Sequence, residues 1–575
     1  MDKRTLFFWL YFFLLNLLLF LPRYLMDFDH STFFPDFSLE ETFSKKWELF
    51  FRRNNNDIFK LSVDLTFLTF IFYLFRKRLP FKGTLFVFFI WYLTIFIYQL
   101  YQGIIEIVYD SEPLFYNDWY LAGEGMSILT SELNSATVVL VGLLFLFAIF
   151  MLFLLANRFA KNIFEVQFGW GSKVFGLLLI LITALAVVNY RTRLETSTLT
   201  FSSQGYFIKD NAARSIKIRK LIKNMDVDNL SKHYDYSHYQ LVEKPNLYIL
   251  FIESYGKILY DHPQLKESHL NDLLNTQKIL RDSTWFSVSG FSRSPVKGAG
   301  SWLSYTSFLM GTTIDKHIIY RSLLAQKNTD FPHLFGIFKT YGYEIYRLSS
   351  LPDTRKDIPY SDYTRFYKID HWISYHDLNY VGKKYGWGPS PPDQYSLNFA
   401  HDLIKDQQEK EPFVLFFIDV NSHNPFASPT NAVDDWRSLN RSPKGLPQDS
   451  DFFSKPTLEN YQSAIKYQLD YLSQFIVKNG SENDIFLLIG DHQPPLLASD
   501  EDGFETPVHI IAKDSTFIGD FVNEGFQEGL IIEEGNRAFN HAGLYSLFMR
   551  QVIKNYGIAN EDLPVFFPEG VKLNN

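Results

Sequence analysis

The chain has 575 residues, a formal net charge of −8, no cysteine, and 47% hydrophobic and 18% aromatic residues. So many aromatic residues exclude a disordered chain. The lack of cysteine excludes a disulfide framework, thiol catalysis and any cysteine-ligated metal, and the negative charge argues against nucleic acid as a partner. At roughly 150 residues per domain, the length allows about three or four domain-sized units. The hydrophobic residues are concentrated before residue 190.

Five apolar segments in this N-terminal part each approach the roughly 20 residues that cross a membrane. The second contains Asp64, which is costly inside a bilayer unless it faces a partner or water, so four spans are the alternative interpretation. We expect an α-helical membrane domain over residues 1–190 with about five transmembrane helices. The expected spans are 6–22, 58–75, 83–104, 135–156 and 174–190.

The charges of the short loops indicate how these spans are oriented. The loop 76–82 after the second span is basic, and the segment after the fourth span carries Arg158, Lys161 and Lys173. Basic loops stay in the cytoplasm. We therefore expect a cytoplasmic N-terminus, a first span kept as an uncleaved anchor, and all residues after the fifth span outside a bacterial cytoplasmic membrane.

The remaining residues have the composition of a water-soluble region. Residues 191–245 are predicted to be a charged juxtamembrane linker, and residues 246–575 one large extracytoplasmic domain. There, apolar runs of strand length alternate with helical patterns such as 334–341 and 458–478. This alternation predicts an α/β domain whose central sheet is covered by helices on both faces. The expected strands are 246–252, 344–348, 413–420, 484–489 and 507–512.

Chemically reactive side chains follow three of these strands. Glu253 follows the first, His423 lies just after the third, and Gly490-Asp491-His492 ends the fourth. Ligand sites of open α/β sheets lie at the carboxyl ends of the strands, and carboxylates with imidazoles are ligands for Zn²⁺ or Mn²⁺. Gly490 is expected to let the backbone turn sharply. Taken singly, a Glu after a strand is usually a solvated cap, and Gly-Asp-His is a turn as often as a pair of ligands.

A glycine-rich turn over 297–300 leads into a predicted helix that starts at Ser301, with Gly311 ten residues later. A hydroxyl at a helix N-terminus lies in a positive field. Next to a divalent cation it loses its proton more easily and becomes a nucleophile. The alternative is that Ser301 is only the N-cap of the helix.

Together these segments resemble the sulfatase and alkaline-phosphatase superfamily. More narrowly they are similar to its polytopic membrane members, the lipoteichoic acid synthases, phosphoglycerol transferases and phosphoethanolamine transferases. The resemblance covers roughly 245–560 and rests on Glu253 and the segments 301–311, 422–426 and 490–492. It implies an α/β fold with a central mixed sheet, outside the membrane.

The resemblance also implies a site and a reaction. One divalent ion, Mn²⁺ or Zn²⁺, is expected on Glu253, Ser301, Asp491 and His492. A phosphoglycerol or phosphoethanolamine head group is expected to pass from a membrane phospholipid to an envelope glycan or glycolipid through a phospho-Ser301 intermediate.

Two further residues complete the expected site. His423 is predicted to protonate the leaving group or bind phosphate oxygens. Arg347, in the strand 344–348, is predicted to clamp the phosphate, with a surface salt bridge as the alternative.

Three departures from the family patterns bear on the choice of activity. The polytopic transferases generally use Thr as nucleophile, where this chain has Ser301. Sulfatases mature a Cys or Ser followed by Pro and Arg, and the stretch from Ser301 to Tyr305 lacks both, which argues against sulfate-ester hydrolysis. Phosphoethanolamine transferases usually contain disulfides, so the lack of cysteine favours the lipoteichoic-acid-synthase side. The competing functions are a membrane-anchored phosphate or sulfate-ester hydrolase and a non-catalytic envelope factor.

Overall fold

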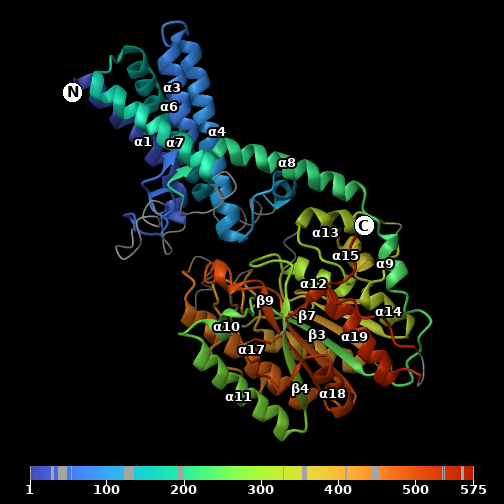
Figure 1. The fold of residues 1–575 in the computed structure, drawn as a ribbon. Helices are drawn as coiled ribbons and strands as arrows, with labels where there is room; N and C mark the ends of the chain where they lie inside the picture. The colour runs from blue at the N-terminus through green and yellow to red at the C-terminus, as the bar shows by residue number, and fades with distance from the viewer. Residues whose placement is uncertain are drawn as a thin grey trace. The chain divides into compact units, whose positions relative to one another are not determined.

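The computed structural model divides the chain into two compact units (Figure 1). The first comprises residues 1–107 and 112–218, and the second residues 108–111 and 219–575. The residues described are 2–26, 31–36, 48, 50–53, 55–121, 123, 135–190, 199–327, 329–352, 359–386, 388–407, 411–442, 454–533, 535–536, 538–558 and 562–573.

Apolar helices dominate the first unit. Among the described residues, four of them are long and apolar enough to cross a membrane: α1 (Lys3–Met26), α4 (Phe81–Val108), α6 (Ser135–Glu165) and α7 (Trp170–Tyr190). The second expected span contains α3 (Val63–Phe75), which is apolar but has 13 residues. The chain is thus membrane-embedded through four to five apolar helices.

Asp64, the acid inside the second expected span, lies in the first turn of α3 and has partners. Its carboxylate accepts hydrogen bonds from Ser203 Oγ and from the backbone N–H of Gly205, each at 3.2 Å. Gly205 belongs to the first turn of α8 (Gln204–Lys223), where unpaired N–H groups favour an anion. The carboxylate therefore holds the start of α8.

A mixed sheet forms the centre of the second unit. Its path runs β10-β4-β9-β8-β3-β7-β5-β6, with β11 also paired to β4. The strands from β8 to β6 are parallel, whereas β9 is antiparallel to β8 and β4 is antiparallel to β9 and β10. The strand bounds are β3 Asn246–Ile252, β4 Phe286–Arg293, β5 Glu344–Leu348, β6 His371–Ile373, β7 Phe413–Ile418, β8 Asp484–Gly490, β9 Glu505–Ala512, β10 Gln527–Glu528 and β11 Phe539–Asn540.

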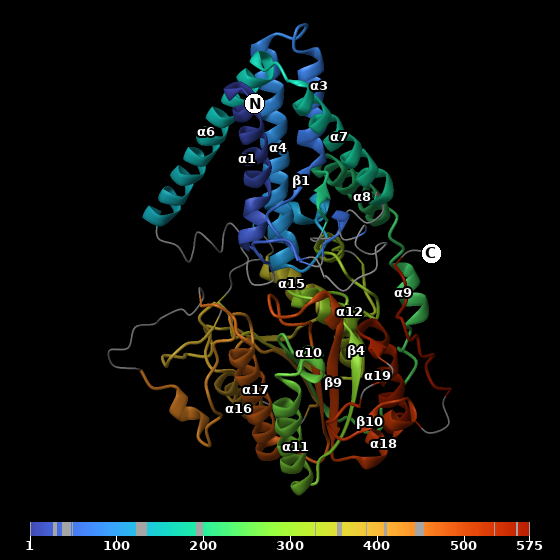
Figure 2. The ribbon, with the colours of Figure 1, turned by 60° about the vertical axis from the view of Figure 1, so that its left-hand side comes forward.

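Helices cover both faces of this sheet, as expected (Figure 2). Side chains of β3 alternate between the faces: Leu247, Ile249 and Phe251 enter one hydrophobic core, and Tyr248 and Leu250 enter the other. The first core includes α12 (Ser301–Met310), α13 (His317–Leu324), α14 (Leu334–Thr340), α18 (Ser515–Asn523) and α19 (His541–Tyr556). The second includes α10 (Ile258–Asp261), α11 (Lys266–Asp282), α16 (Asp393–Gln407) and α17 (Leu458–Asn479).

All five predicted strands are present, as β3, β5, β7, β8 and β9, and the two predicted helices are α14 and α17. The order of the strands brings β7, β3 and β8 side by side and parallel. Their carboxyl ends therefore lie together at one edge of the sheet, where a ligand site is expected.

Candidate active site

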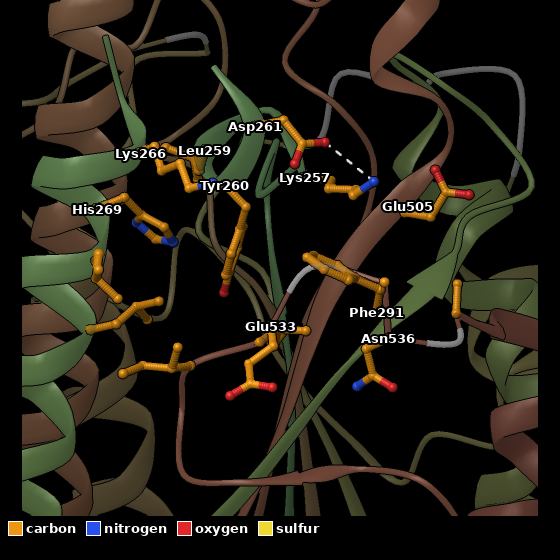
Figure 3. A pocket seen from close by; sticks show the side chains of 16 residues that line it. Lys257, Leu259, Tyr260, Asp261, Lys266, His269, Phe291, Glu505, Glu533 and Asn536 are labelled. Atoms are coloured by element: carbon orange, nitrogen blue, oxygen red, sulfur yellow. Dashed lines mark ion pairs between the residues drawn. The ribbon is translucent and has the colours of Figure 1, made fainter. Parts of the chain in front are cut away.

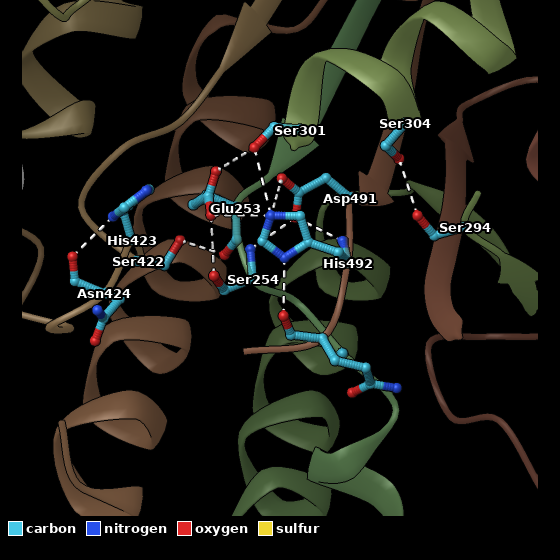
Figure 4. Close-up of polar contacts among 12 residues, drawn as sticks. Glu253, Ser254, Ser294, Ser301, Ser304, Ser422, His423, Asn424, Asp491 and His492 are labelled. Atoms are coloured by element: carbon cyan, nitrogen blue, oxygen red, sulfur yellow. Dashed lines mark hydrogen bonds and ion pairs between the residues drawn. The ribbon is translucent and has the colours of Figure 1, made fainter. Parts of the chain in front are cut away.

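Glu253, Asp491 and His492 meet at this edge of the sheet (Figure 4). One ligand atom from each lies within 4.8 Å of the others. Glu253 follows β3, and the other two follow β8, which pairs with β3 up to the Ile252–Gly490 pair. All three side chains are buried, at 4%, 0% and 1% exposure. Two buried carboxylates this close repel each other unless a cation lies between them.

Ser301 points into the same cluster from the start of α12. Its Oγ lies 2.9 Å from Glu253 Oε2, to which it donates a hydrogen bond, and 3.5 Å from His492 Nε2. The N-cap of α12 is Gly300, in the left-handed region with a φ of 85°, so Ser301 is the first helical residue. The interpretation of Ser301 as the N-cap is therefore wrong, and its hydroxyl faces the acids.

The donor atoms of the cluster fit a divalent cation. His492 Nδ1 lies 2.8 Å from the carbonyl oxygen of Gln493 and donates a hydrogen bond to it. The lone pair of the ring is therefore on Nε2, which faces the carboxylates. Nε2 lies 3.5 Å from Glu253 Oε1 and 3.3 Å from Asp491 Oδ2. Asp491 Oδ2 is buried and has no hydrogen-bond partner among the described residues. Two carboxylates, one imidazole and a hydroxyl match the chemistry of Zn²⁺ or Mn²⁺.

The ionisation of the two carboxylates is strongly perturbed. Burial opposes ionisation of Glu253, but the neighbouring His423 and His492 outweigh it and hold the pKa of Glu253 below its ordinary value. Burial, together with the charge of Glu253, raises the pKa of Asp491 well above its ordinary value. Such divergent shifts within one cluster are typical of functional sites.

Backbone geometry at two positions presents these ligands. Ser254 has a φ of 59°, its N–H donates to Asp491 Oδ1 at 2.7 Å, and its Oγ donates to Glu253 Oε1 at 3.0 Å. Gly490 is needed because a Cβ there would lie 2.1 Å from the carbonyl oxygen of Tyr255. Its φ is not among the positive values, so close approach, rather than the expected sharp turn, requires glycine.

Asp419 and Ser422 are site residues that sequence analysis missed. Asp419 Oδ1 accepts hydrogen bonds from the backbone N–H of Glu253 at 2.9 Å and from Ser422 Oγ at 3.0 Å. Ser422 Oγ also lies 2.7 Å from the carbonyl oxygen of Glu253. The two side chains therefore hold both backbone groups of Glu253. The available signal was an acid at the end of the apolar run 413–420.

His423 follows the same strand, and its charge acts on Glu253. Its Nδ1 lies 2.7 Å from the carbonyl oxygen of Asn424 and donates to it. That bond fixes the tautomer and makes Nε2 the ring nitrogen that can gain or lose a proton.

Arg347 lies in β5, and aromatic rings surround its guanidinium group. The centroids of Tyr305, Tyr367, Trp372 and Phe416 lie 5.6, 5.7, 4.7 and 5.1 Å away. Tyr305 belongs to α12, one turn after Ser301. The described part of the chain offers no hydrogen-bond partner to Nε or Nη1 and no ion-pair partner to the side chain, which is unlike a surface salt bridge.

A cavity of about 570 Å³ lies beside α10 and α11 (Figure 3). Lys257, Tyr260, His269 and Phe291 are among its lining residues, and none of the predicted site residues is. The cavity is therefore separate from the candidate active site.

Comparison with known proteins agrees with this architecture. Residues 249–516 match the family model described as Sulfatase. The chain carries a sulfatase-family domain. That match begins within β3 and ends within α18, so it includes Glu253, Ser301, Asp491 and His492. No curated protein sequence matches the chain.

Solved structures similar to this chain come from several bacteria. The lipoteichoic acid synthase LtaP from Listeria monocytogenes is 15% identical, with 60% of this chain and 81% of that chain covered and a TM-score of 0.37. The periplasmic domain of EptC from Escherichia coli is 14% identical, with 55% of this chain and 84% of that chain covered and a TM-score of 0.35. The phosphoglycerol transferase GacH from Streptococcus pyogenes, in complex with sn-glycerol-1-phosphate, is 12% identical, with 57% of this chain and 82% of that chain covered and a TM-score of 0.34.

Proposed function

We propose that this protein is a metal-dependent transferase that moves a phospho-head-group from a membrane phospholipid to an envelope glycan or glycolipid. The observation that carries the proposal is the hydrogen bond from Ser301 Oγ to Glu253 Oε2, inside a buried cluster that fits a divalent cation. A hydroxyl so placed is a nucleophile with a proton acceptor at hand.

In the first step, Ser301 Oγ attacks the phosphorus atom of the lipid phosphodiester. The hydroxyl proton passes to Glu253 Oε2, a bond forms between Oγ and phosphorus, and the bond from phosphorus to the diacylglycerol oxygen breaks. His423 protonates that oxygen, so that diacylglycerol leaves and the head group stays on Ser301 as a phosphodiester.

In the second step, a hydroxyl of the glycan or glycolipid acceptor attacks the same phosphorus atom. Its proton passes to His423, a bond forms between the acceptor oxygen and phosphorus, and the bond from phosphorus to Ser301 Oγ breaks. Ser301 Oγ then regains its proton from Glu253 Oε2. Arg347 binds the phosphate oxygens in both steps. This gives its buried Nε and Nη1 groups an anionic hydrogen-bond partner.

Glu253, Asp491, His492 and Ser301 would hold one Zn²⁺ or Mn²⁺ ion. Such an ion lowers the pKa of the Ser301 hydroxyl and neutralises the charge that develops on the phosphate. The remaining contributions come from the chain itself: Asp419 and Ser422 position Glu253, and the burial of the cluster strengthens each electrostatic interaction within it.

The membrane helices suit a donor that is itself a membrane lipid. A catalytic domain held at the membrane meets such a donor at high effective concentration. We place the sulfatase-family domain on the outer side of a bacterial cytoplasmic membrane, because the basic loops of the first unit favour a cytoplasmic N-terminus.

The test uses the full chain in detergent, with Mn²⁺ or Zn²⁺ and phosphatidylglycerol or phosphatidylethanolamine labelled in an acyl chain. We expect release of labelled diacylglycerol from one of the lipids. Ser301→Ala should abolish release, whereas Ser304→Ala, a buried serine of the same helix, should retain it. Release unaffected by Ser301→Ala would contradict the proposal. Release of free phospho-head-group, without transfer to any acceptor hydroxyl, would favour a hydrolase.

A further inference from the structure

Helix α8 carries a cationic face that the proposed reaction does not use. Its sequence has a single acid, Asp210, which pairs with Arg214 at 2.7 Å. Five other basic residues of α8 are exposed, and none pairs with a carboxylate within the described ranges. They are Lys209, Lys217, Arg219, Lys220 and Lys223.

These five residues lie on one side of the helix. At about 100° per residue they fall within roughly half of the circumference, and Lys209 and Lys223 are about 21 Å apart along the axis. Ile216 lies among them and is 58% exposed. An array of five cations around an exposed apolar side chain contrasts with the net charge of −8 of the whole chain.

The opposite side of α8 is fastened within the first unit, to which residues 204–218 belong, and Arg219, Lys220 and Lys223 continue the same helix into the second unit. Asn211 Oδ1 accepts a hydrogen bond from the N–H of Phe115 at 2.7 Å, and Ser215 Oγ accepts one from the N–H of Tyr116 at 3.2 Å. Phe207 is buried against Tyr98, and Asp64 holds the first turn. These contacts leave Lys209 and Lys217 on the uncovered side of the helix.

We propose that the cationic face of α8 binds a surface of anionic phospholipid headgroups and so supplies the active site with an anionic donor lipid. The face lies on the helix that follows the last apolar helix in the chain. Basic residues close to a membrane attract anionic lipids, and Ile216 suits insertion between headgroups. The second part rests on the proposed function, and it favours a phosphatidylglycerol-like donor over zwitterionic phosphatidylethanolamine.

The test measures lipid enrichment around the full chain, and it needs no turnover. The protein is reconstituted in phosphatidylcholine vesicles with a tenth of phosphatidylglycerol and extracted with a styrene–maleic acid polymer, and the lipid ratio of the discs is measured by mass spectrometry. We expect phosphatidylglycerol to be enriched about threefold over the bulk vesicle. The triple variant K217Q/R219Q/K220Q should lose this enrichment, as should the wild type in 1 M salt.

The matched control is K266Q/K278Q/R281Q, which removes three exposed cations from α11 of the second unit and should keep the enrichment. Equal enrichment in wild type and K217Q/R219Q/K220Q would overturn the proposal. The proposal would also be overturned if K217Q/R219Q/K220Q lost binding to soluble polyphosphate but kept its lipid enrichment. That result would assign the face to a soluble polyanion.

Turnover is measured separately in the same vesicles. The variant K217Q/R219Q/K220Q should need a several-fold higher fraction of phosphatidylglycerol for half-maximal rate, with kcat unchanged. Enrichment without turnover of any anionic lipid would support the lipid surface and overturn the donor assignment.

Discussion

The backbone N–H of Glu253 donates a hydrogen bond to Asp419 Oδ1 over 2.9 Å, and thereby joins the end of β3 to the end of β7. Because Asp419 also accepts from Ser422, it fixes the main chain from which Glu253 projects. Asp419→Ala should therefore weaken metal affinity by roughly 10- to 100-fold, measured by titration with Zn²⁺ or Mn²⁺. Asp419→Asn keeps an acceptor oxygen and should recover most of that affinity.

The control is Asp484→Ala, which removes an equally buried carboxylate, 3% exposed like Asp419. Asp484 bonds Asn246 and Ser481 at the opposite end of β8. It should lower thermal stability and leave metal affinity unchanged. If Asp419→Ala behaves in the same way, Asp419 has no positioning role.

Removal of the divalent ion should destabilise the sulfatase-family domain. A ligand that binds only the folded state at 100 times its Kd stabilises it by about 2.7 kcal/mol. We expect chelation to lower the Tm of the full chain and added Zn²⁺ or Mn²⁺ to restore it. Asp491→Asn should have a Tm that no longer responds to chelator. A Tm that is indifferent to chelation in the wild type would argue against a metal site.

Arg347 should act on substrate binding. Replacing it with Gln removes the guanidinium that faces the aromatic rings of Tyr305 and Trp372. Loss of charge-assisted hydrogen bonds to phosphate should raise KM by roughly 10- to 100-fold, measured in steady-state assays of head-group release. Arg281→Gln, at an exposed ion pair with Glu528, should leave KM unchanged. An unchanged KM in Arg347→Gln would assign Arg347 to packing alone.

The free energy of unfolding of the second unit should decrease at acidic pH because His509 is buried. Burial lowers the pKa of His509 from 6.5 to about 3, where it bonds Ser289 Oγ at 2.6 Å and Tyr255 Oη at 3.0 Å. Below pH 6.5, His509 therefore binds a proton in the unfolded chain but not in the folded chain. The stabilisation is complete above pH 6.5 and decreases by about 1.36 kcal/mol per pH unit below it.

Urea unfolding at pH 7 and pH 5 measures this dependence. The wild type should lose about 2 kcal/mol more than His509→Gln between the two values. His376→Gln, at an exposed histidine, should follow the wild type. Identical pH dependence in wild type and His509→Gln would contradict the assignment.

The sequence predicted β3, β5, β7, β8 and β9 because these buried strands are continuous apolar runs, such as 484–489. It missed the short edge strand β6, which has only three residues. It also missed β4, whose residues Phe286–Arg293 include three serines and a glycine, because its polar side chains interrupt the apolar pattern and are satisfied by tertiary contacts. Ser289, for example, donates to the carbonyl of Gly529. Propensity cannot show such contacts.

At the candidate site, the sequence predicted side chains that lie together in the structure, but not the contacts that hold them. Glu253, Ser301, Asp491 and His492 are brought together. Asp419 was hidden because its partner is a backbone N–H 166 residues away in the chain. The close approach that requires Gly490 likewise depends on Tyr255, in the segment after β3, which spacing along the chain does not reveal.

The central claim is that Ser301 carries the head group between the two steps. The full chain is incubated with Mn²⁺ or Zn²⁺ and phosphatidylglycerol without acceptor, quenched with acid, digested and analysed by mass spectrometry. The account predicts a glycerophosphoryl group on the peptide that contains Ser301, and no such group in Ser301→Ala. Release of diacylglycerol while the Ser301 peptide stays unmodified in a rapidly quenched sample would contradict it.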